Sequence, residues 1–231
     1  MDLSVVVPCY NEEARLPVSL ARVASFLEEH GGSFELILVD DGSDDRTLEI
    51  IREAERRLPY VRVLSLPHRG KGAALAQGVR RSRGRLVLLS DADFSTPIEE
   101  LTRLEEAIAE GADVAIGSRA APGAREVDQP LHRRLMGKTF NLLVQALLLP
   151  GIWDTQCGFK LFRGPVARQL FDQLHTTGFA FDVEVLYLAR RSGHRVREVP
   201  VRWINSPSSR VSPLRDARNM ALDLLRIRFT R

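Results

Sequence analysis

The sequence predicts an α/β fold in which a mostly parallel sheet is flanked by helices. In the first half of the chain, short apolar runs that suit buried strands alternate with amphipathic helical patterns. One helical pattern separates each apolar run from the next, which is the spacing of βαβ units. No linker or internal repeat divides the 231 residues, of which 44% are hydrophobic. We therefore expect a single domain that buries one sizeable core.

The elements of the first half can be assigned in order. Predicted strands cover residues 3–7, 34–39, 61–66, 86–89 and 114–116, because each is a short apolar run. Predicted helices cover residues 16–29, 46–57, 73–81 and 97–110. The last helix has a typical start, because Thr96 can serve as N-cap, Pro97 suits the first helical position and Glu99 can close a capping box.

After Gly117 the pattern becomes less regular. A polar loop, residues 118–130, leads to a predicted helix over residues 131–149 that is basic at its start and apolar at its end. Further helices are expected near residues 165–174 and 182–191, a strand near 196–203 and a last helix from about 214. Asp182 stands at the start of its helix and is expected to cap it.

Composition excludes several classes of protein. The net charge is only +3, basic residues are interleaved with acidic ones, and no stacking series of aromatics accompanies them, so nucleic-acid binding is not expected. Two cysteines, Cys9 and Cys157, are too few for a disulfide scaffold and are expected to pack as small apolar side chains in a reducing cytoplasm. The N-terminus does not resemble a signal peptide, and the longest apolar stretch, residues 140–153, is too short to span a membrane.

Candidate ligand-binding residues follow four of the predicted strands. The first strand is followed by Pro8, Tyr10 and Glu12, and the second strand is followed by Asp40 and Asp41. The third strand is followed by the basic, glycine-rich stretch His68-Arg69-Gly70-Lys71-Gly72. The fourth strand is followed by Asp91, Ala92 and Asp93. The carboxyl ends of parallel strands lie at one edge of a sheet, where ligands of such folds bind. Acidic groups beside a basic glycine-rich loop predict a nucleotide whose phosphates contact Lys71 and a divalent cation.

Asp91 and Asp93 are the candidates for holding Mg²⁺ or Mn²⁺. These ions prefer hard oxygen ligands and accept one or two carboxylates together with substrate phosphates. Such an ion would neutralise charge that develops on a diphosphate leaving group. The alternative is that both aspartates cap the next helix, but Thr96 already serves there, so we favour the metal. Asp40 could accept hydrogen bonds from a base edge or ribose, and Tyr10 offers a face for stacking.

The segments VVVPCYNEE, LVDDGSDD, RGKGAAL, SDADFSTP and GSR, in this order, resemble the family 2 inverting glycosyltransferases of the GT-A fold. The later segments DTQCGFKLF, FAFDVEVL and NSPSSRVSPLRDA resemble the dolichyl-phosphate β-glucosyltransferase branch and its bacterial polyprenyl-phosphate relatives. The resemblance implies one GT-A domain over residues 1–231. Residues 1–118 would form its nucleotide-sugar-binding half, and residues 119–231, with their amphipathic helices, its acceptor-binding half.

The resemblance also implies roles for individual residues. The nucleoside would be held by Pro8, Tyr10, Glu12, Asp40 and Asp41, and the diphosphate and metal by Asp91, Ala92 and Asp93, with Arg210 closing over the diphosphate. Asp93 is expected to be catalytic as well as a metal ligand. In polyprenyl-phosphate mannosyltransferases a Gln two residues beyond this triplet also contacts the metal. This chain has Ser95 there, so a third protein ligand is left open.

Arginines and one further aspartate are implied at the acceptor. Arg119 and one of the pair Arg133 and Arg134 match family arginines that hold phosphates of the donor or the acceptor, and all three are taken as candidates for the acceptor phosphate. Asp154 matches an acidic position proposed to act on the acceptor and is taken as a second catalytic candidate. It could equally anchor Arg133, Arg134 or Lys160.

The implied reaction is inverting transfer of a hexose, with glucose from UDP-glucose favoured over mannose from GDP-mannose, to a polyprenyl or dolichyl phosphate. The second pKa of a phosphate monoester is about 6, so this acceptor is largely a dianion near neutrality and needs positioning more than deprotonation. Two alternatives remain. One is a soluble metal-dependent glycosyltransferase that acts on a small phosphorylated or hydroxylated acceptor, and the other is a non-catalytic nucleotide-binding module.

A lipid acceptor requires approach to a membrane surface, for which two basic amphipathic segments are candidates. Residues 131–149 are expected at the interface, because basic amphipathic helices bind anionic bilayers. The last helix, from about residue 214, is expected to pack much of its apolar face on the core. Packing on the sheet or on a second copy in a homodimer is the alternative for both. We expect a peripheral protein on the cytoplasmic face.

Overall fold

The computed structural model describes residues 1–127, 131–205 and 222–229. In this part of the chain, a seven-stranded sheet has the order β3-β2-β1-β4-β7-β5-β8. Its strands are β1 (Leu3–Cys9), β2 (Phe34–Asp40), β3 (Val61–Ser65), β4 (Leu86–Leu89), β5 (Val114–Ser118), β7 (Lys160–Arg163) and β8 (Val196–Pro200). Each pairs in parallel with its neighbours except β7, which runs antiparallel to both β4 and β5. The predicted mostly parallel α/β sheet is therefore confirmed.

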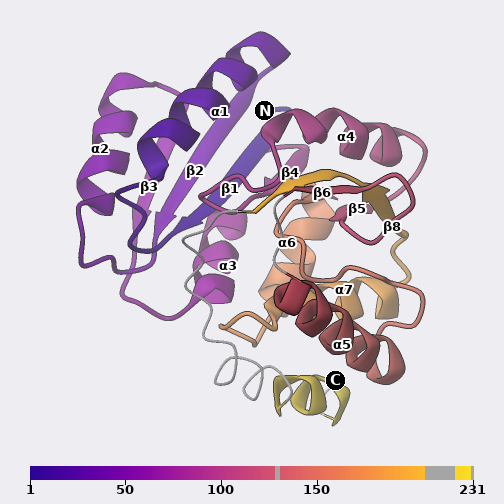
Figure 1. The fold of residues 1–231 in the computed structure, drawn as a ribbon. Helices are drawn as coiled ribbons and strands as arrows, with labels where there is room; N and C mark the ends of the chain where they lie inside the picture. Colours follow the sequence, from indigo (N-terminus) through magenta and orange to yellow (C-terminus); the bar gives the residue numbers. More distant parts are fainter. Residues whose placement is uncertain (128–130, 206–221, 230–231) are drawn as a thin grey trace.

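Helices cover both faces of this sheet (Figure 1). They are α1 (Leu16–His30), α2 (Thr47–Arg57), α3 (Lys71–Arg81), α4 (Leu101–Ala109), α5 (Leu131–Leu147), α6 (Gly164–Asp172) and α7 (Phe181–Arg191), and residues 222–229 are also helical. Side chains alternate along a strand, so Val6 packs with α3, α6 and α7 while Val5 and Val7 pack with α1 and α4. Burial on both faces explains why these strands read as continuous apolar runs.

The chain departs from the predicted elements at three strands. β7 was not predicted, because it is short and begins with a lysine, Lys160, which is fully buried in the structure. The single strand expected over residues 196–203 is broken at Val201 into β8 and β9 (Arg202–Ile204). β9 pairs in parallel with β6 (Arg125–Val127), which lies in the segment expected to be a polar loop.

Two predicted helix caps are wrong. The helical turn after β4 begins as a 3₁₀ turn, Ile98–Glu100, whose N-cap is Pro97. The buried Thr96 hydroxyl instead lies 3.6 Å from the Cys157 sulfur, and Glu99 pairs with Arg22 rather than closing a capping box. α7 likewise has Ala180 at its N-cap, because Asp182 turns inward to a buried ion pair.

The two cysteines are free and buried, as expected of small apolar side chains. Among the described helices, none combines the length and the apolar character that crossing a bilayer requires.

Candidate active site

The carboxyl ends of β1, β2 and β4 bring the predicted acidic residues to one edge of the sheet. Cys9 and Asp40 are partners in the β1–β2 register, so the segments that follow these two strands start side by side. Arg15, at the start of α1, joins two of the strand ends. Its guanidinium donates to Glu12 at 2.6 and 2.8 Å and lies 3.4 Å from Asp93. The convergence predicted from topology is confirmed, with Arg15 as an added cation.

The two aspartates at the carboxyl end of β2 are buried and bind the local backbone. Asp41 accepts hydrogen bonds from the backbone N–H groups of Arg69 and Gly70, both at 2.9 Å. Asp40 accepts one at 3.2 Å from the backbone of Ser43. Asp41 therefore holds the glycine-rich loop before α3 in place and stabilises the position from which Lys71 begins the helix.

Tyr10 has the aromatic face that was predicted for stacking, and in the structure the ring of His68 stacks on that face. The His68 ring stacks on Tyr10 with centroids 4.3 Å apart, and its Nδ1 lies 2.9 Å from an Asp41 carboxylate oxygen. Gly42 permits this arrangement, because it has a φ of +72° and a side chain there would meet the His68 backbone nitrogen at 2.6 Å. Pro8 lies within β1, opposite Val39.

The acidic triplet after β4 forms a turn whose two carboxylates have different partners. Asp91 Oδ1 lies 2.5 Å from the Lys71 ammonium. Asp93 accepts a hydrogen bond at 3.0 Å from the backbone of Ser95. Ala92 between them is buried in the core cluster that contains Phe94. The triplet therefore presents two carboxylates outward and anchors itself through its middle residue.

Charge around this turn is balanced. Burial alone would raise the pKa of Asp91, but the positive charges of Lys71, Lys160 and Arg119 outweigh it and lower that pKa. Burial alone would lower the pKa of Lys71, and Asp91 and Asp182 reverse the direction. Asp91 and Lys71 therefore both stay charged near neutrality.

Asp91 and Asp93 fit a hard divalent cation. Their side chains are partly exposed, at 39% and 19%, and both carry the oxygen ligands that Mg²⁺ and Mn²⁺ prefer. Over the described residues, no third His, Cys, Asp or Glu joins them to complete a protein-only metal site. Mg²⁺ that is bound by one or two carboxylates usually takes further ligands from substrate phosphates and water.

The start of β7 and the residues just before it contribute two features that the sequence did not reveal. Gly158 packs directly against Asp91, because a side chain at residue 158 would lie 2.2 Å from Asp91 Oδ2. Lys160 is fully buried, donates to the Cys157 carbonyl at 2.5 Å and forms a short ion pair with Asp182. A lysine inside an apolar segment was the available signal, but its partner is distant in sequence and only the fold brings the two together.

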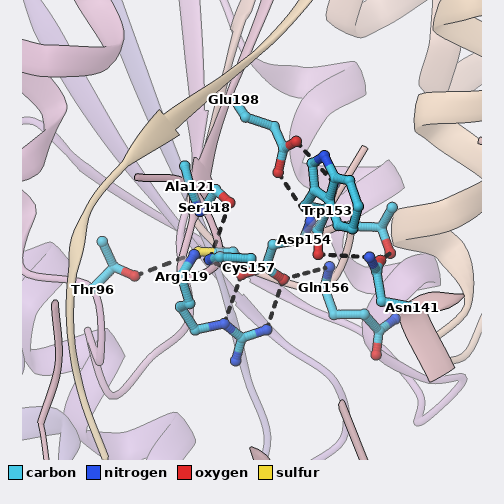
Figure 2. Close-up of polar contacts among 12 residues, drawn as sticks. Thr96, Ser118, Arg119, Ala121, Asn141, Trp153, Asp154, Gln156, Cys157 and Glu198 are labelled. Atoms are coloured by element: carbon cyan, nitrogen blue, oxygen red, sulfur yellow. Dashed lines mark hydrogen bonds and ion pairs between the residues drawn. The ribbon is translucent and has the colours of Figure 1, made fainter. Parts of the chain in front are cut away.

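Three residues before Cys157 in the same segment, Asp154 clamps Arg119 (Figure 2). The guanidinium donates from Nε and Nη2 to both carboxylate oxygens at 2.7 and 2.8 Å, and the Arg119 backbone N–H donates to the same group at 2.8 Å. Glu198 holds this loop by accepting from the backbone nitrogens of Trp153 and Asp154 at 2.8 and 2.9 Å. Glu198 was not anticipated, because its role depends on backbone groups.

Asp154 is therefore a partner of Arg119, which was not among the anchoring partners predicted for it. Burial alone would raise the pKa of Asp154, but the charge and hydrogen bonds of Arg119 lower it. The backbones of Arg133 and Arg134 lie in the first turn of α5, and their side chains lie outside what the structure describes. Arg210 lies outside the described residues altogether.

Comparison with known proteins gives matches over nearly the whole chain. The family model described as glycosyl transferase family 2 matches residues 4–171. A dolichyl-phosphate beta-glucosyltransferase of Dictyostelium discoideum is 38% identical over 241 residues, covering 98% of this chain and 74% of that relative. The human dolichyl-phosphate beta-glucosyltransferase is 38% identical over 243 residues, covering 99% of this chain and 75% of the relative.

Solved structures share the fold at lower identity. Glucosyl-3-phosphoglycerate synthase of Mycobacterium tuberculosis, solved with Mn²⁺, UDP and glucosyl-3-phosphoglycerate, matches with a TM-score of 0.72 at 21% identity, covering 98% of this chain and 80% of that chain. Mannosyl-3-phosphoglycerate synthase from Rubrobacter xylanophilus matches with a TM-score of 0.72 at 20% identity, covering 98% and 72%. Both likenesses concern the fold, which is the GT-A fold predicted from the sequence.

Proposed function

The chain belongs to glycosyl transferase family 2, and from that premise we propose that it transfers glucose from UDP-glucose to dolichyl phosphate or a related polyprenyl phosphate, with inversion. It is a glycosyltransferase of the GT-A fold. The choice of sugar and acceptor is supported by the names of its relatives at 38% identity. One observation carries the proposal: the short segment from Asp154 to Gly158 holds Arg119 at one end and packs against Asp91, the partner of Lys71, at the other, which places a site suited to a second phosphate near a site suited to the donor diphosphate.

We assign the donor to the half formed by residues 1–118 and the acceptor to residues 119–231. In this assignment Tyr10, Asp40 and Asp41 border the nucleoside, and Lys71 donates to the diphosphate. Asp91 and Asp93 would hold Mg²⁺ or Mn²⁺, an ion that supplies positive charge to the departing diphosphate when bound. The same metal with UDP is present in a solved structure of the same fold, glucosyl-3-phosphoglycerate synthase.

The acceptor phosphate needs orientation rather than a base. Its attacking oxygen bonds to the anomeric carbon while the bond from that carbon to the diphosphate oxygen breaks, and the electron pair leaves with UDP. A phosphate monoester with a second pKa of about 6 is largely a dianion near neutrality, so no proton has to be removed first. Arg119 is suited to hold this dianion in line, because Asp154 fixes its guanidinium and leaves other N–H groups free to donate.

Replacement of Asp154 by Asn distinguishes an anchor from a base. As an anchor, Asp154→Asn loosens Arg119 and should raise KM for the lipid phosphate about tenfold, which corresponds to about 1.4 kcal/mol, and should leave KM for the donor unchanged. Steady-state kinetics with each substrate varied in turn measures this. A fall in kcat of about 10²–10⁴ at unchanged acceptor KM would instead assign general-base catalysis to Asp154.

We also propose that the protein binds the cytoplasmic face of a membrane peripherally through α5. From Lys138 onward, the exposed positions of this helix include Leu142, Leu143 and Leu147, and Leu142 is 61% exposed. A basic start followed by an apolar outer face suits an anionic bilayer. A homodimer that covers the same face is the alternative. In the last helical segment, residues 222–229, Leu224 and Ile227 are buried while Leu225 is exposed, and the start of the helix expected from about residue 214 lies outside the described residues.

The decisive assay supplies radiolabelled UDP-glucose, Mn²⁺ and polyprenyl phosphate in anionic vesicles, and counts label in the extracted lipid. We expect labelled lipid from UDP-glucose, none from GDP-mannose, and no labelled product when phosphoglycerate replaces the lipid. Protein that pellets with the same vesicles reports membrane binding. Transfer to the soluble acceptor alone would favour the small-molecule glycosyltransferase.

Asp93→Ala and a chelator provide the matched controls. Both should reduce transfer by about 10²–10³, because the charge of the leaving diphosphate loses its counter-charge. Circular dichroism should be unchanged, since the Asp93 side chain lies partly exposed in a turn. Equal turnover with and without Mn²⁺ would refute the metal assignment.

A further inference from the structure

In the structure, the ammonium group of a lysine is paired with Asp91, one of the two carboxylates expected to bind metal. The Lys71 ammonium lies 2.5 Å from Asp91 Oδ1, a strong charge-assisted contact. Asp93, the other candidate ligand, lies 3.4 Å from the Arg15 guanidinium. A divalent ion that enters the ligand-free protein therefore meets Asp91 already paired with an ammonium and Asp93 close to a guanidinium, and it must displace the ammonium to bind Asp91.

Several contacts hold Lys71 in this position. Its helix starts from a loop fixed by Asp41, and the next residue, Gly72, donates its backbone N–H to the Thr177 carbonyl at 2.7 Å. A side chain at Gly72 would lie 2.6 Å from that carbonyl oxygen, so the two segments are in direct contact. The ammonium also lies 5.6 Å from the centre of the Phe181 ring. The pairing is therefore part of the folded structure rather than a chance surface contact.

We propose that Lys71 makes metal binding conditional on the donor diphosphate. In the ligand-free protein its ammonium neutralises Asp91. When the diphosphate binds, the ammonium pairs with a phosphate oxygen instead and leaves Asp91 free to accept the divalent ion. This inference rests on the proposed use of a nucleoside diphosphate and a divalent ion at this site, and it adds the order in which the site is filled.

Thermodynamic linkage makes the proposal quantitative. Coupling between two ligands is reciprocal, and its usual range is about 5- to 150-fold in affinity. Part of the coupling between Mn²⁺ and UDP arises because the diphosphate itself ligates the ion, so cooperativity in the wild type alone is not diagnostic. The diagnostic quantity is the affinity for Mn²⁺ without nucleotide, because there Lys71 acts only as a competitor.

In the experiment, each protein variant is titrated with Mn²⁺ in the presence and in the absence of saturating UDP. The concentration of free Mn²⁺ is measured by electron paramagnetic resonance. Lys71→Met should bind Mn²⁺ alone about tenfold more tightly than wild type, and UDP alone about tenfold more weakly. Lys71→Arg, which keeps the charge, should bind Mn²⁺ alone as weakly as wild type. Lys138→Met, at an exposed position of α5, is the matched lysine control and should leave both affinities unchanged.

The outcomes separate this inference from the proposed function. If Lys71→Met binds Mn²⁺ alone no more tightly than wild type, the competition is refuted while the metal site stands. If no variant binds Mn²⁺ even with UDP, the metal-dependent function itself fails. Thermal melting of each variant with and without Mn²⁺ gives a second readout, because a ligand that binds only the folded state raises Tm.

Discussion

Gly158→Ala should remove at least 99% of glucosyl transfer and leave the fold intact. The added methyl carbon would lie 2.2 Å from Asp91 Oδ2 and 2.6 Å from Asp91 Cγ, far inside contact distance. Gly158 is not among the glycines with positive φ, so alanine fits its backbone. The partly exposed Asp91 side chain is the group that can move, and moving it breaks the pair with Lys71 and withdraws the carboxylate that we propose as a metal ligand. A hundredfold loss corresponds to about 2.7 kcal/mol of transition-state stabilisation.

The measurement is kcat/KM for UDP-glucose together with Tm. Gly178→Ala is the matched control, because no atom lies within 4 Å of a side chain placed there, and it should retain wild-type kinetics. Asp91→Ala and the double variant Asp91→Ala with Gly158→Ala should be equally impaired, since residues that act through one group are not additive. Full activity of Gly158→Ala, or a further loss in the double variant, would show that Gly158 does not act through Asp91.

The part of the fold that was predictable from sequence is the part whose pattern is local. β1 to β5 were each placed within two residues of their observed ends, because strands buried on both faces are continuous apolar runs. β7 was missed because Lys160 interrupts its apolar character, and the charge is compensated only by Asp182 on another element. The Thr96 cap failed for a similar reason, since its hydroxyl is drawn to Cys157 by tertiary packing.

The candidate site likewise contains some features that local sequence predicts and others that depend on tertiary contacts. Residues that follow strands, such as Asp40, Asp91 and Asp93, could be grouped because topology alone brings the ends of parallel strands together. The partners of these residues could not be deduced. Gly158 beneath Asp91, Arg15 beside Asp93 and the clamp of Asp154 on Arg119 are contacts between segments distant in sequence. Local sequence patterns therefore indicate which charged side chains lie at the site, and only the fold shows which group pairs with each of them.

Lys160→Met should cost about 3–5 kcal/mol of folding free energy, because it leaves the Asp182 carboxylate buried without its partner. Asp182→Leu should cost a similar amount of folding free energy, because it leaves the Lys160 ammonium buried without its partner. The double variant should be more stable than either single variant, because two apolar side chains can replace a buried ion pair at little cost. A residual loss of about 1–3 kcal/mol is expected from the Cys157 carbonyl, which loses the hydrogen bond from Lys160.

Urea unfolding of the wild type, the two single variants and the double variant completes the cycle. Arg22→Met, which breaks the exposed Arg22–Glu99 pair, is the surface control and should cost less than about 1 kcal/mol. If the losses of the two single variants simply add in the double variant, Lys160 and Asp182 do not stabilise the fold as a pair. If they do act as a pair, Lys160, the only lysine buried in the described sheet, attaches the DTQCGFK segment to α7 through Asp182. This attachment also fixes the position of Gly158 against Asp91.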